Sequence, residues 1–375
     1  MPLYHSSAAI LGFCMVVDQG ATYSLGRKFS TKTFWDDIRA SNATVMQYVG
    51  ETCRYLLAAP PQFDPLTGEN LDRKNKVRAA FGNGLRPEIW DRFKERFDIE
   101  AIGEFYSATE GVSGAWNFSR NNFSKGAIGR LGFFGRSLVA KSSAIIKFDM
   151  ANEKPYRDPK TGFCIRIPPS SSEAGEMLYL IDSANIEKSF QGYFQNQGST
   201  ESKVIRDVFV KGDAYFRSGD LISHDAEGRV YFSDRIGDTY RWKSENVSTA
   251  EVSEALSSHP AIHEANVYGV QLPHHDGRAG CAALVLANEP NEKFLKELAT
   301  LARGKLPRYA VPLFLRRRKE MQVTGTNKQQ KHSLREEGVD VGRCGDDELF
   351  WLKGDTYVKF GKREWDELNG GSVKL

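Results

Sequence analysis

Residues 215–220 read YFRSGD, and residues 234–238 read DRIGD. Between these segments lie two short runs of strand-forming residues joined by residues 226–228 (AEG), a pattern that is typical of a β-hairpin. Asp220 and Arg235 are therefore predicted near opposite ends of one rigid element. A carboxylate and a guanidinium in this arrangement can bind the sugar of a nucleotide. The alternative interpretation is an ion pair on the surface beside a hairpin.

A second pattern, upstream, predicts a parallel sheet. Residues 77–81 indicate a buried strand that runs into Gly82-Asn83-Gly84, a helix is expected to begin at Pro87, and residues 99–105 indicate another strand. Elements in this order form a βαβ unit, whose ligands gather at the carboxyl ends of the strands. Gly82 and Gly84 would let the backbone approach a ligand closely, although a plain turn explains these glycines equally well.

The flanking regions predict further elements. Residues 31–59 are expected to form a helix that ends before two prolines, and residues 117–211 an accessory β-subdomain. A capping box at residues 248–251 predicts the start of a helix in a compact α+β lobe. A later helix of this lobe is expected at residues 292–305.

The composition is that of a globular protein. The chain has 375 residues, of which 40% are hydrophobic and 26% charged, so it is long enough for a large domain and a small one. The net charge of +3 gives no field that would require nucleic acid or anionic lipid as a partner. The five cysteines and seven histidines show neither CxxC nor HExxH spacing, so no disulfide framework or zinc site is expected. No apolar run reaches the roughly 18–20 residues of a membrane-spanning helix.

Four segments resemble the signature motifs of AMP-forming acyl-CoA synthetases, and most of all those of the fungal fatty-acid-transport and very-long-chain acyl-CoA synthetase subgroup. They are FYSATEG (105–111), YFRSGDL (215–221), FSDRIGDTYRWKSENVS (232–248) and TGTNKQQK (324–331). The resemblance runs from the first residue to the last. It begins after the family's loop rich in Ser, Thr and Gly that wraps the ATP phosphates.

The resemblance implies an α/β fold with an incomplete large adenylate-forming domain, made of a parallel sheet with helices plus a β-subdomain, and a small α+β C-terminal lobe. Residues 1–236 would be the C-terminal portion of the large AMP-binding domain. Residues 237–345 would be the mobile lobe, and residues 346–375 a tail packed on it. The hinge would be Gly237, because glycine absorbs large changes in φ and ψ; a hairpin turn explains this glycine equally well.

The resemblance also assigns roles to residues of the nucleotide site. Tyr106 would stack on adenine, Thr109 would hydrogen-bond the α-phosphate, and Glu110 would hold Mg²⁺ through a hard oxygen ligand. Asp220 would accept hydrogen bonds from both ribose hydroxyls, and Arg235 would contact the same sugar.

Other roles concern the adenine, the acyl group and the catalytic charge. Gly82 and Gly84 would lie close to the adenine. Lys328 would stabilise negative charge on the carboxylate and the α-phosphate during adenylation. His5 would line the carboxylate side of the acyl pocket, and residues 242–247 would line the path of the CoA pantetheine.

The resulting hypothesis is the activation of long or very-long-chain fatty acids to acyl-CoA through acyl-AMP, with ATP, Mg²⁺ and CoA, and with fatty acid uptake as a coupled process. We expect an intracellular protein at the peroxisome, or in peripheral contact with lipid droplets or the ER membrane. Residues 372–375 (SVKL) resemble a peroxisomal signal. No nucleic acid partner is expected, and the sequence does not set the oligomeric state.

An alternative hypothesis follows from the position of the phosphate loop in the family. Without that loop, several charge-assisted hydrogen bonds to ATP would be lost, so weak or no synthetase activity is expected of this chain alone. The chain would then be a non-catalytic remnant that binds lipid or nucleotide, or an incompletely folding fragment of such a ligase with open strand edges.

Overall fold

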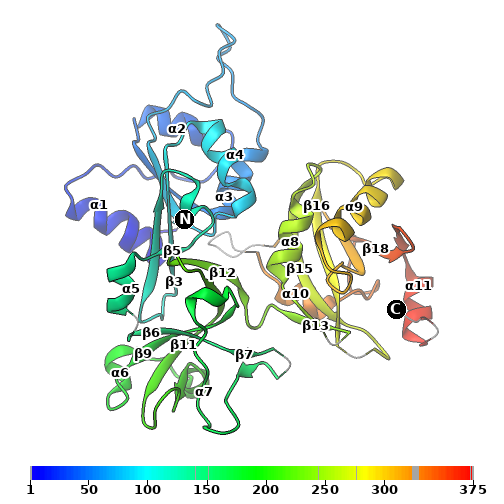
Figure 1. The fold of residues 1–375 in the computed structure, drawn as a ribbon. Coiled ribbons are helices and arrows are strands. Elements are labelled where there is room, and N and C mark those ends of the chain that lie inside the picture. The colour runs from blue at the N-terminus through cyan, green and yellow to red at the C-terminus, as the bar shows by residue number, and fades with distance from the viewer. Residues whose placement is uncertain are drawn as a thin grey trace. The chain divides into compact units, whose positions relative to one another are not determined.

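The computed structural model divides into two compact units (Figure 1). Of the described residues, those up to Phe148 and those from Pro155 to Phe232 form the first unit. Asp149–Lys154 and the residues from Ser233 onward form the second. The structure describes all residues except Met1, Ala140, Ala151, Ser244, Asp276, 323–328, Ser372, Lys374 and Leu375.

The first unit contains a largely parallel sheet with strand order β1-β2-β3-β4. Strands β1, β2 and β3 are parallel, and β4 is antiparallel to β3. Helices α3 and α4 connect the parallel strands, which confirms the predicted βαβ unit. The strands and these helices are β1 (Val45–Val49), α3 (Gly50–Ala58), β2 (Ala79–Asn83), α4 (Pro87–Phe97), β3 (Ala101–Ser107) and β4 (Gly114–Ser119).

Helices pack on this sheet through large aromatic side chains. Helix α4 begins at Pro87, as predicted, and its buried residues recur every four positions until Asp98, in the left-handed conformation, ends the helix. The rings of Trp35 and Phe97 stack with centroids 4.3 Å apart and join α2 (Phe34–Ala40) to α4. Each such buried side chain contributes about 1.5–3 kcal/mol. The same core contains Met46, Tyr48, Cys53, Leu56, Ile89, Trp90, Phe93 and Ile102.

The prediction of one helix over residues 31–59 is wrong. Helix α2 ends at Ala40, Asn42 has a left-handed φ of 50°, and β1 then separates α2 from α3. The β1 sequence is rich in β-branched and aromatic residues, which favour a strand. A segment of five residues is too short for its apolar pattern to distinguish a helix from a strand, so the pairing of β1 with β2 determines that it is a strand.

The remainder of the first unit is built on an antiparallel sheet. Its strand order is β5-β12-β11-β9-β6, and β10 pairs with β11. The predicted hairpin is confirmed, because β11 and β12 are neighbours joined by a short turn. The strands are β5 (Gly129–Arg130), β6 (Ser143–Ile146), β9 (Gly175–Ile181), β10 (Val204–Arg206), β11 (Ala214–His224) and β12 (Arg229–Arg235).

Short elements complete this part of the chain. A helix of π type, η1 (Ser7–Cys14), leads into α1 (Met15–Asp18). The others are η2 (Asn122–Ser124), α5 (Phe133–Val139), β7 (Phe148–Asp149), β8 (Lys154–Pro155), η3 (Pro169–Ser171), α6 (Ile186–Ser189) and α7 (Gln197–Ser202).

The second unit is an α+β assembly around a sheet with strand order β15-β16-β17-β18-β19. Helix α8 begins at the predicted cap, where the Ser248 hydroxyl accepts from the Glu251 N–H, and α9 has the predicted bounds. The elements are β13 (Tyr240–Trp242), β14 (Glu245–Val247), α8 (Thr249–Ser257), β15 (Ile262–Gln271), β16 (Arg278–Leu286), α9 (Glu292–Lys305), β17 (Phe314–Arg318), α10 (His332–Glu337), β18 (Glu348–Lys353), β19 (Thr356–Phe360) and α11 (Lys362–Asn369). None of the helices in the described parts of the chain has the length and apolar character that a membrane span needs.

The close approach of β1 and β2 requires glycine at position 82. A Cβ atom at Gly82 would lie 2.1 Å from the carbonyl oxygen of Tyr48. We expect Gly82→Ala to lower the free energy of unfolding by about 1–3 kcal/mol, because the strands must move apart. The control is Gly26→Ala, where a Cβ meets nothing within 4 Å. Urea unfolding of both variants measures the difference, and equal stabilities would contradict this packing.

Candidate functional site

Two of the predicted site residues meet in the first unit. Tyr106 lies near the carboxyl end of β3, and Asp220 lies on β11. The hydroxyl of Tyr106 donates a hydrogen bond of 2.6 Å to Oδ2 of Asp220. Burial raises the pKa of Tyr106 and the nearby charge of Asp220 raises it further, so that Tyr106 remains a neutral donor. Two motifs whose residues lie 114 positions apart are thus joined directly.

Strand β11 changes register where it reaches Asp220. Its pairing with β9 shifts between Arg217 and Leu221, and Gly219 within the shift has a φ of 78°. Just before the shift, Arg217 binds the fully buried Glu176 of β9 through two guanidinium nitrogens, with Nη2 2.8 Å from Oε2. Burial raises the pKa of Glu176, although Arg217 opposes this. Such a forked ion pair is strong and directional, so it anchors the segment that carries Asp220.

Glu110 lies in the turn after β3 and is held by two side chains from a distant segment. The hydroxyl of Tyr193 donates a hydrogen bond of 2.9 Å to Oε1 of Glu110, and Nζ of Lys203 lies 3.9 Å from the same atom. Burial, and then the bond to Glu110, raises the pKa of Tyr193 to about 12. Thr109, beside Glu110, is exposed. An open hollow of about 500 Å³ adjoins this cluster and is lined by Tyr193, Phe194, Asn196, Ser199, Ser202 and Lys203.

The carboxylate of Glu110 suits Mg²⁺ as one ligand among several. Mg²⁺ is usually held by one or two carboxylates together with water and the phosphates of a substrate. Across the described residues, no group of three or more His, Cys, Asp or Glu side chains comes together. Glu110 can therefore supply one oxygen ligand to Mg²⁺, with water and the phosphates of a nucleotide as the other ligands.

Gly82 and Gly84 lie at the end of β2 and in the turn that follows it. Gly84 has a φ of 78°, a conformation that favours glycine. Its N–H donates a hydrogen bond of 3.0 Å to the buried carboxylate of Glu104 on β3. The turn therefore lies at the carboxyl ends of the parallel strands, where ligands are expected.

His5 lies just before η1 and takes part in a local turn. Its Nδ1 is 3.1 Å from the hydroxyl of Ser7 and accepts from the N–H of the same residue. The Ser7 carbonyl in turn accepts a hydrogen bond of 2.8 Å from Gln47 on β1. This places the segment beside β1, and the role of His5 toward an acyl group stays a prediction.

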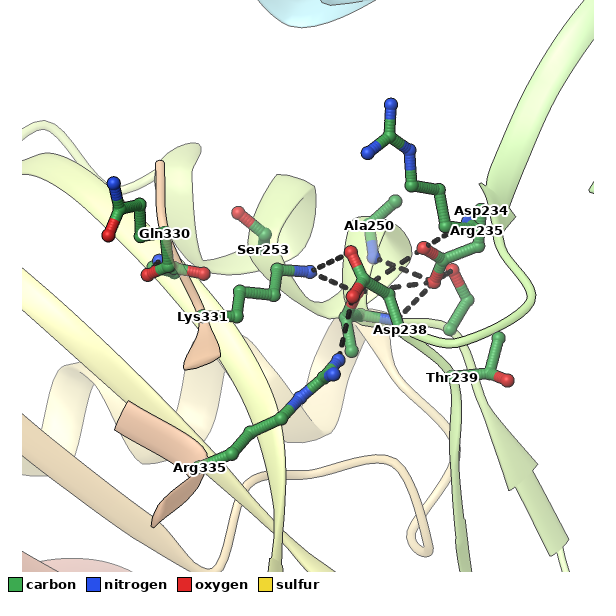
Figure 2. A network of polar contacts seen from close by, with 12 residues as sticks. Asp234, Arg235, Asp238, Thr239, Ala250, Ser253, Gln330, Lys331 and Arg335 are labelled. Atoms are coloured by element: carbon green, nitrogen blue, oxygen red, sulfur yellow. Dashed lines mark hydrogen bonds and ion pairs between the residues drawn. The ribbon is translucent and has the colours of Figure 1, made fainter. Parts of the chain in front are cut away.

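Arg235 and Gly237 belong to the second unit, at the end of β12 and in the turn that follows. The preceding residue, Asp234, is buried, and its Oδ2 accepts from the Thr249 N–H over 2.6 Å and from the Ser248 hydroxyl over 2.9 Å. This carboxylate therefore stabilises the N-terminus of α8, where backbone N–H groups lack partners. Figure 2 shows the side chain of Arg235 extending away from Asp238.

Asp238 forms the centre of a charged cluster on the other side of Gly237 (Figure 2). Its Oδ2 lies 3.1 Å from Nζ of Lys331, and its Oδ1 lies 2.7 Å from Nη2 of Arg335. Lys331 also donates a hydrogen bond of 2.7 Å to the hydroxyl of Thr249. Burial would raise the pKa of Asp238, but the two cations outweigh it and hold this pKa below its ordinary value. Burial lowers the pKa of Lys331, although Asp238 opposes this.

Sequence analysis missed several residues of these clusters. Glu104 stands alone as a charged residue inside an apolar strand, a pattern that marks a buried polar group with a specific partner. Tyr193 and Lys203 lie in a region without a recognisable motif, so no sequence signal indicated them. Lys331 follows Lys328 by three positions, and Lys328 itself lies outside the described residues.

The comparisons with known proteins agree on one family. The model for AMP-binding enzymes matches residues 1–156, and the model for their C-terminal domain matches residues 251–328, which together cover more than half of the chain. The chain belongs to the AMP-binding enzymes. Its fold is shared with them: ATP-bound MatB from Rhodopseudomonas palustris matches 90% of this chain and 58% of its own length with a TM-score of 0.66 at 20% identity. The chain thus has a partial adenylate-forming fold of mixed α/β type.

Curated relatives of this AMP-binding enzyme match over its whole length. The "Very long-chain fatty acid transport protein" of Cochliobolus heterostrophus is 42% identical over 100% of the chain and 57% of its own length. The "Isopenicillin N epimerase component 1" of Hapsidospora chrysogena is also 42% identical over 100% of the chain and 61% of its own length. The chain therefore spans about three-fifths of the length of these relatives.

The cluster around Asp238 predicts a specific loss of stability. Asp238→Asn removes the carboxylate that Lys331 and Arg335 both bind, so we expect the free energy of unfolding to fall by about 1–3 kcal/mol at neutral pH. The pKa of Asp238 is lowered on folding, so its contribution is fully present above pH 3.8 and is lost as the pH falls through the lower folded value. Guanidinium unfolding of wild type and variant over a pH series measures this difference.

The matched control is Glu367→Gln, which removes the same charge from an exposed pair with Arg363. Its effect should stay below about 1 kcal/mol. A difference between wild type and Asp238→Asn that does not shrink on acidification would contradict the ion-pair explanation.

Proposed function

We propose that the first unit binds an adenylate, and that the protein takes part in the ATP-dependent activation of long or very-long-chain fatty acids to acyl-CoA through acyl-AMP. The observation that carries this proposal is the hydrogen bond between Tyr106 and Asp220. It brings an aromatic ring and a carboxylate together from two separate motifs. A flat ring suits a base, and a carboxylate suits the two hydroxyls of a ribose.

The chemistry requires a good leaving group on a carboxylate. Attack of the fatty acid carboxylate on the α-phosphate of ATP forms acyl-AMP and releases pyrophosphate, and the CoA thiol then displaces AMP. Such a reaction is accelerated by positioning and by stabilisation of charge. In the first unit, Asp220 would orient the ribose, and Thr109 would donate a hydrogen bond to the α-phosphate.

Glu110 would hold Mg²⁺, and the ion would neutralise phosphate charge when bound. Tyr193 orients this carboxylate through a neutral donor, and Lys203, 3.9 Å from the same oxygen, offsets part of its charge until a cation binds. The roles expected for His5, Arg235, Gly237 and Lys328 stay predictions.

The fatty acid is proposed because relatives from several organisms carry names of long-chain or very long-chain fatty acid transport proteins. The name of the Hapsidospora chrysogena relative refers instead to isopenicillin N. A carboxylic acid other than a fatty acid is therefore the second candidate substrate. Association with peroxisomes, lipid droplets or the ER surface, and coupled uptake, belong to the same proposal.

The decisive measurement is nucleotide binding by the full chain. We expect AMP to bind more tightly than 2′,3′-dideoxy-AMP, and Asp220→Asn to weaken AMP binding by about 10–100-fold, because charge-assisted hydrogen bonds to the ribose are lost. The preference for AMP over the dideoxy analogue should disappear in this variant. Isothermal titration calorimetry measures all four affinities.

The control is Glu227→Gln, which removes one charge from the turn of the same hairpin. It should bind AMP like the wild type. An oleoyl sulfamate of adenosine should bind more tightly than AMP if the acyl chain is recognised. Equal affinity of the wild type for AMP and its dideoxy analogue would refute the role of Asp220.

A further inference from the structure

The buried carboxylate of Glu104 has no role in the chemistry described above. Glu104 lies on β3 with only 1% of its surface exposed. It accepts three hydrogen bonds: 2.5 Å from the Tyr48 hydroxyl, 3.0 Å from the Gly84 N–H and 3.0 Å from the Leu85 N–H. Burying a carboxylate is unfavourable unless it is well bonded, so this arrangement is specific.

Glu104 holds the turn between β2 and α4 from one side. The N–H groups of Gly84 and Leu85 are consecutive, and both point to this one carboxylate. On the other side, a Cβ atom at Gly50, the first residue of α3, would lie 1.7 Å from the carbonyl oxygen of Gly84. The turn is therefore hydrogen-bonded at its amides to β3, and its Gly84 carbonyl packs closely against Gly50 of α3.

We propose that Glu104 is a positioning residue that fixes the Gly82–Leu85 turn in the shape that receives the base of the bound nucleotide. The part of this proposal that names a nucleotide base as the ligand rests on the proposed function. The part that says Glu104 fixes the conformation of the turn does not depend on it. The turn lies at the carboxyl ends of the parallel strands, on the strand next to the one that carries Tyr106. A turn without this anchor would have to be ordered by the ligand at the expense of affinity.

The carboxyl group can hold the turn in both of its protonation states. Burial raises the pKa of Glu104 to about 8, although its hydrogen bonds oppose this. The Tyr48 hydroxyl also lies 3.1 Å from the Gly103 carbonyl oxygen. When Glu104 is protonated, its O–H can donate to Tyr48, and Tyr48 can donate to Gly103. The ionised form accepts stronger, charge-assisted bonds from the turn, so the turn is held more firmly above this pKa.

The groups around Glu104 do not titrate in the same range. Two titratable side chains close to it are Tyr48 on β1 and Cys53 on α3, and both interact with its charge. Burial raises the pKa of both, and the charge of Glu104 raises each further. Neither of these two groups therefore accounts for a transition near the pKa of Glu104, and loss of that transition in Glu104→Gln assigns it to Glu104.

The test uses Glu104→Gln in the full chain. An amide side chain has one acceptor oxygen, so it cannot accept from Gly84 and Leu85 as the carboxylate does, and one of these N–H groups loses its partner. We expect that amide to exchange its hydrogen about tenfold faster in hydrogen–deuterium exchange. In the wild type, protection of these two amides against a local opening of the turn that leaves Glu104 buried should rise as the pH passes above about 8, and in the variant it should not.

Two further variants test whether a change in exchange is caused by Glu104 itself. Glu100→Gln changes an exposed glutamate just before β3 and should leave the turn unchanged. Tyr48→Phe keeps both amide bonds but removes a donor to the ionised carboxylate, so the transition should move to higher pH. If Glu104→Gln does not fold, this shift remains the deciding measurement.

The pH dependence of the free energy of unfolding gives a second test, because the direction of the expected change is known. The folded pKa of Glu104 lies above the ordinary value of 4.5, so the folded state binds more protons between 4.5 and about 8. The wild type should therefore lose stability relative to Glu104→Gln as the pH rises through this range. A difference independent of pH would contradict a buried titrating carboxyl at position 104.

Binding of AMP separates this inference from the proposed function. If the wild type does not bind AMP, the proposed function fails, while faster exchange in Glu104→Gln still supports the hold on the turn. If exchange at Gly84 and Leu85 is unchanged in Glu104→Gln, the inference is overturned whatever AMP does. If exchange increases but AMP affinity falls by less than about twofold, the role of the turn in receiving the base is overturned.

Discussion

The proposed nucleotide site depends on one hydrogen bond, which joins a strand of the parallel sheet to a strand of the antiparallel sheet in the first unit. The Tyr106 hydroxyl and the Asp220 carboxylate each lie at an irregular point, one near a strand end and the other in a register shift. The buried pair of Arg217 and Glu176 anchors β11 beside the shift, so the distance between the two motifs is determined from both sides.

A common chemical arrangement recurs in this unit. Three carboxylates, on Asp220, Glu110 and Glu104, each accept a hydrogen bond from a tyrosine hydroxyl. A tyrosine orients a carboxylate without cancelling its charge, whereas an arginine would neutralise it. The tyrosine of the first pair thus leaves Asp220 the charge that a ribose would use, whereas Glu110 also lies 3.9 Å from Nζ of Lys203, which offsets part of its charge. The third, more deeply buried, directs its oxygens to the backbone instead.

The elements with strong local signals could be predicted from the sequence. Pro87 and the fourfold spacing of apolar residues defined α4, Ser248 and Glu251 defined the start of α8, and the short AEG connection defined the hairpin. The strand β1 could not be predicted, because only its pairing with β2 distinguishes it from a helix. Contacts such as Tyr193 with Glu110 join segments 83 positions apart, and no local pattern encodes such a meeting.

The turn at Gly237 is bracketed by two anchored carboxylates. Asp234 on one side caps α8, and Asp238 on the other binds Lys331 and Arg335. Both sets of contacts lie within the second unit. A rotation of the backbone at Gly237 must therefore break one set before the residue can use its conformational freedom. These contacts therefore hold the turn in one backbone conformation, and the helix cap and the ion pairs together set the free energy needed to change it.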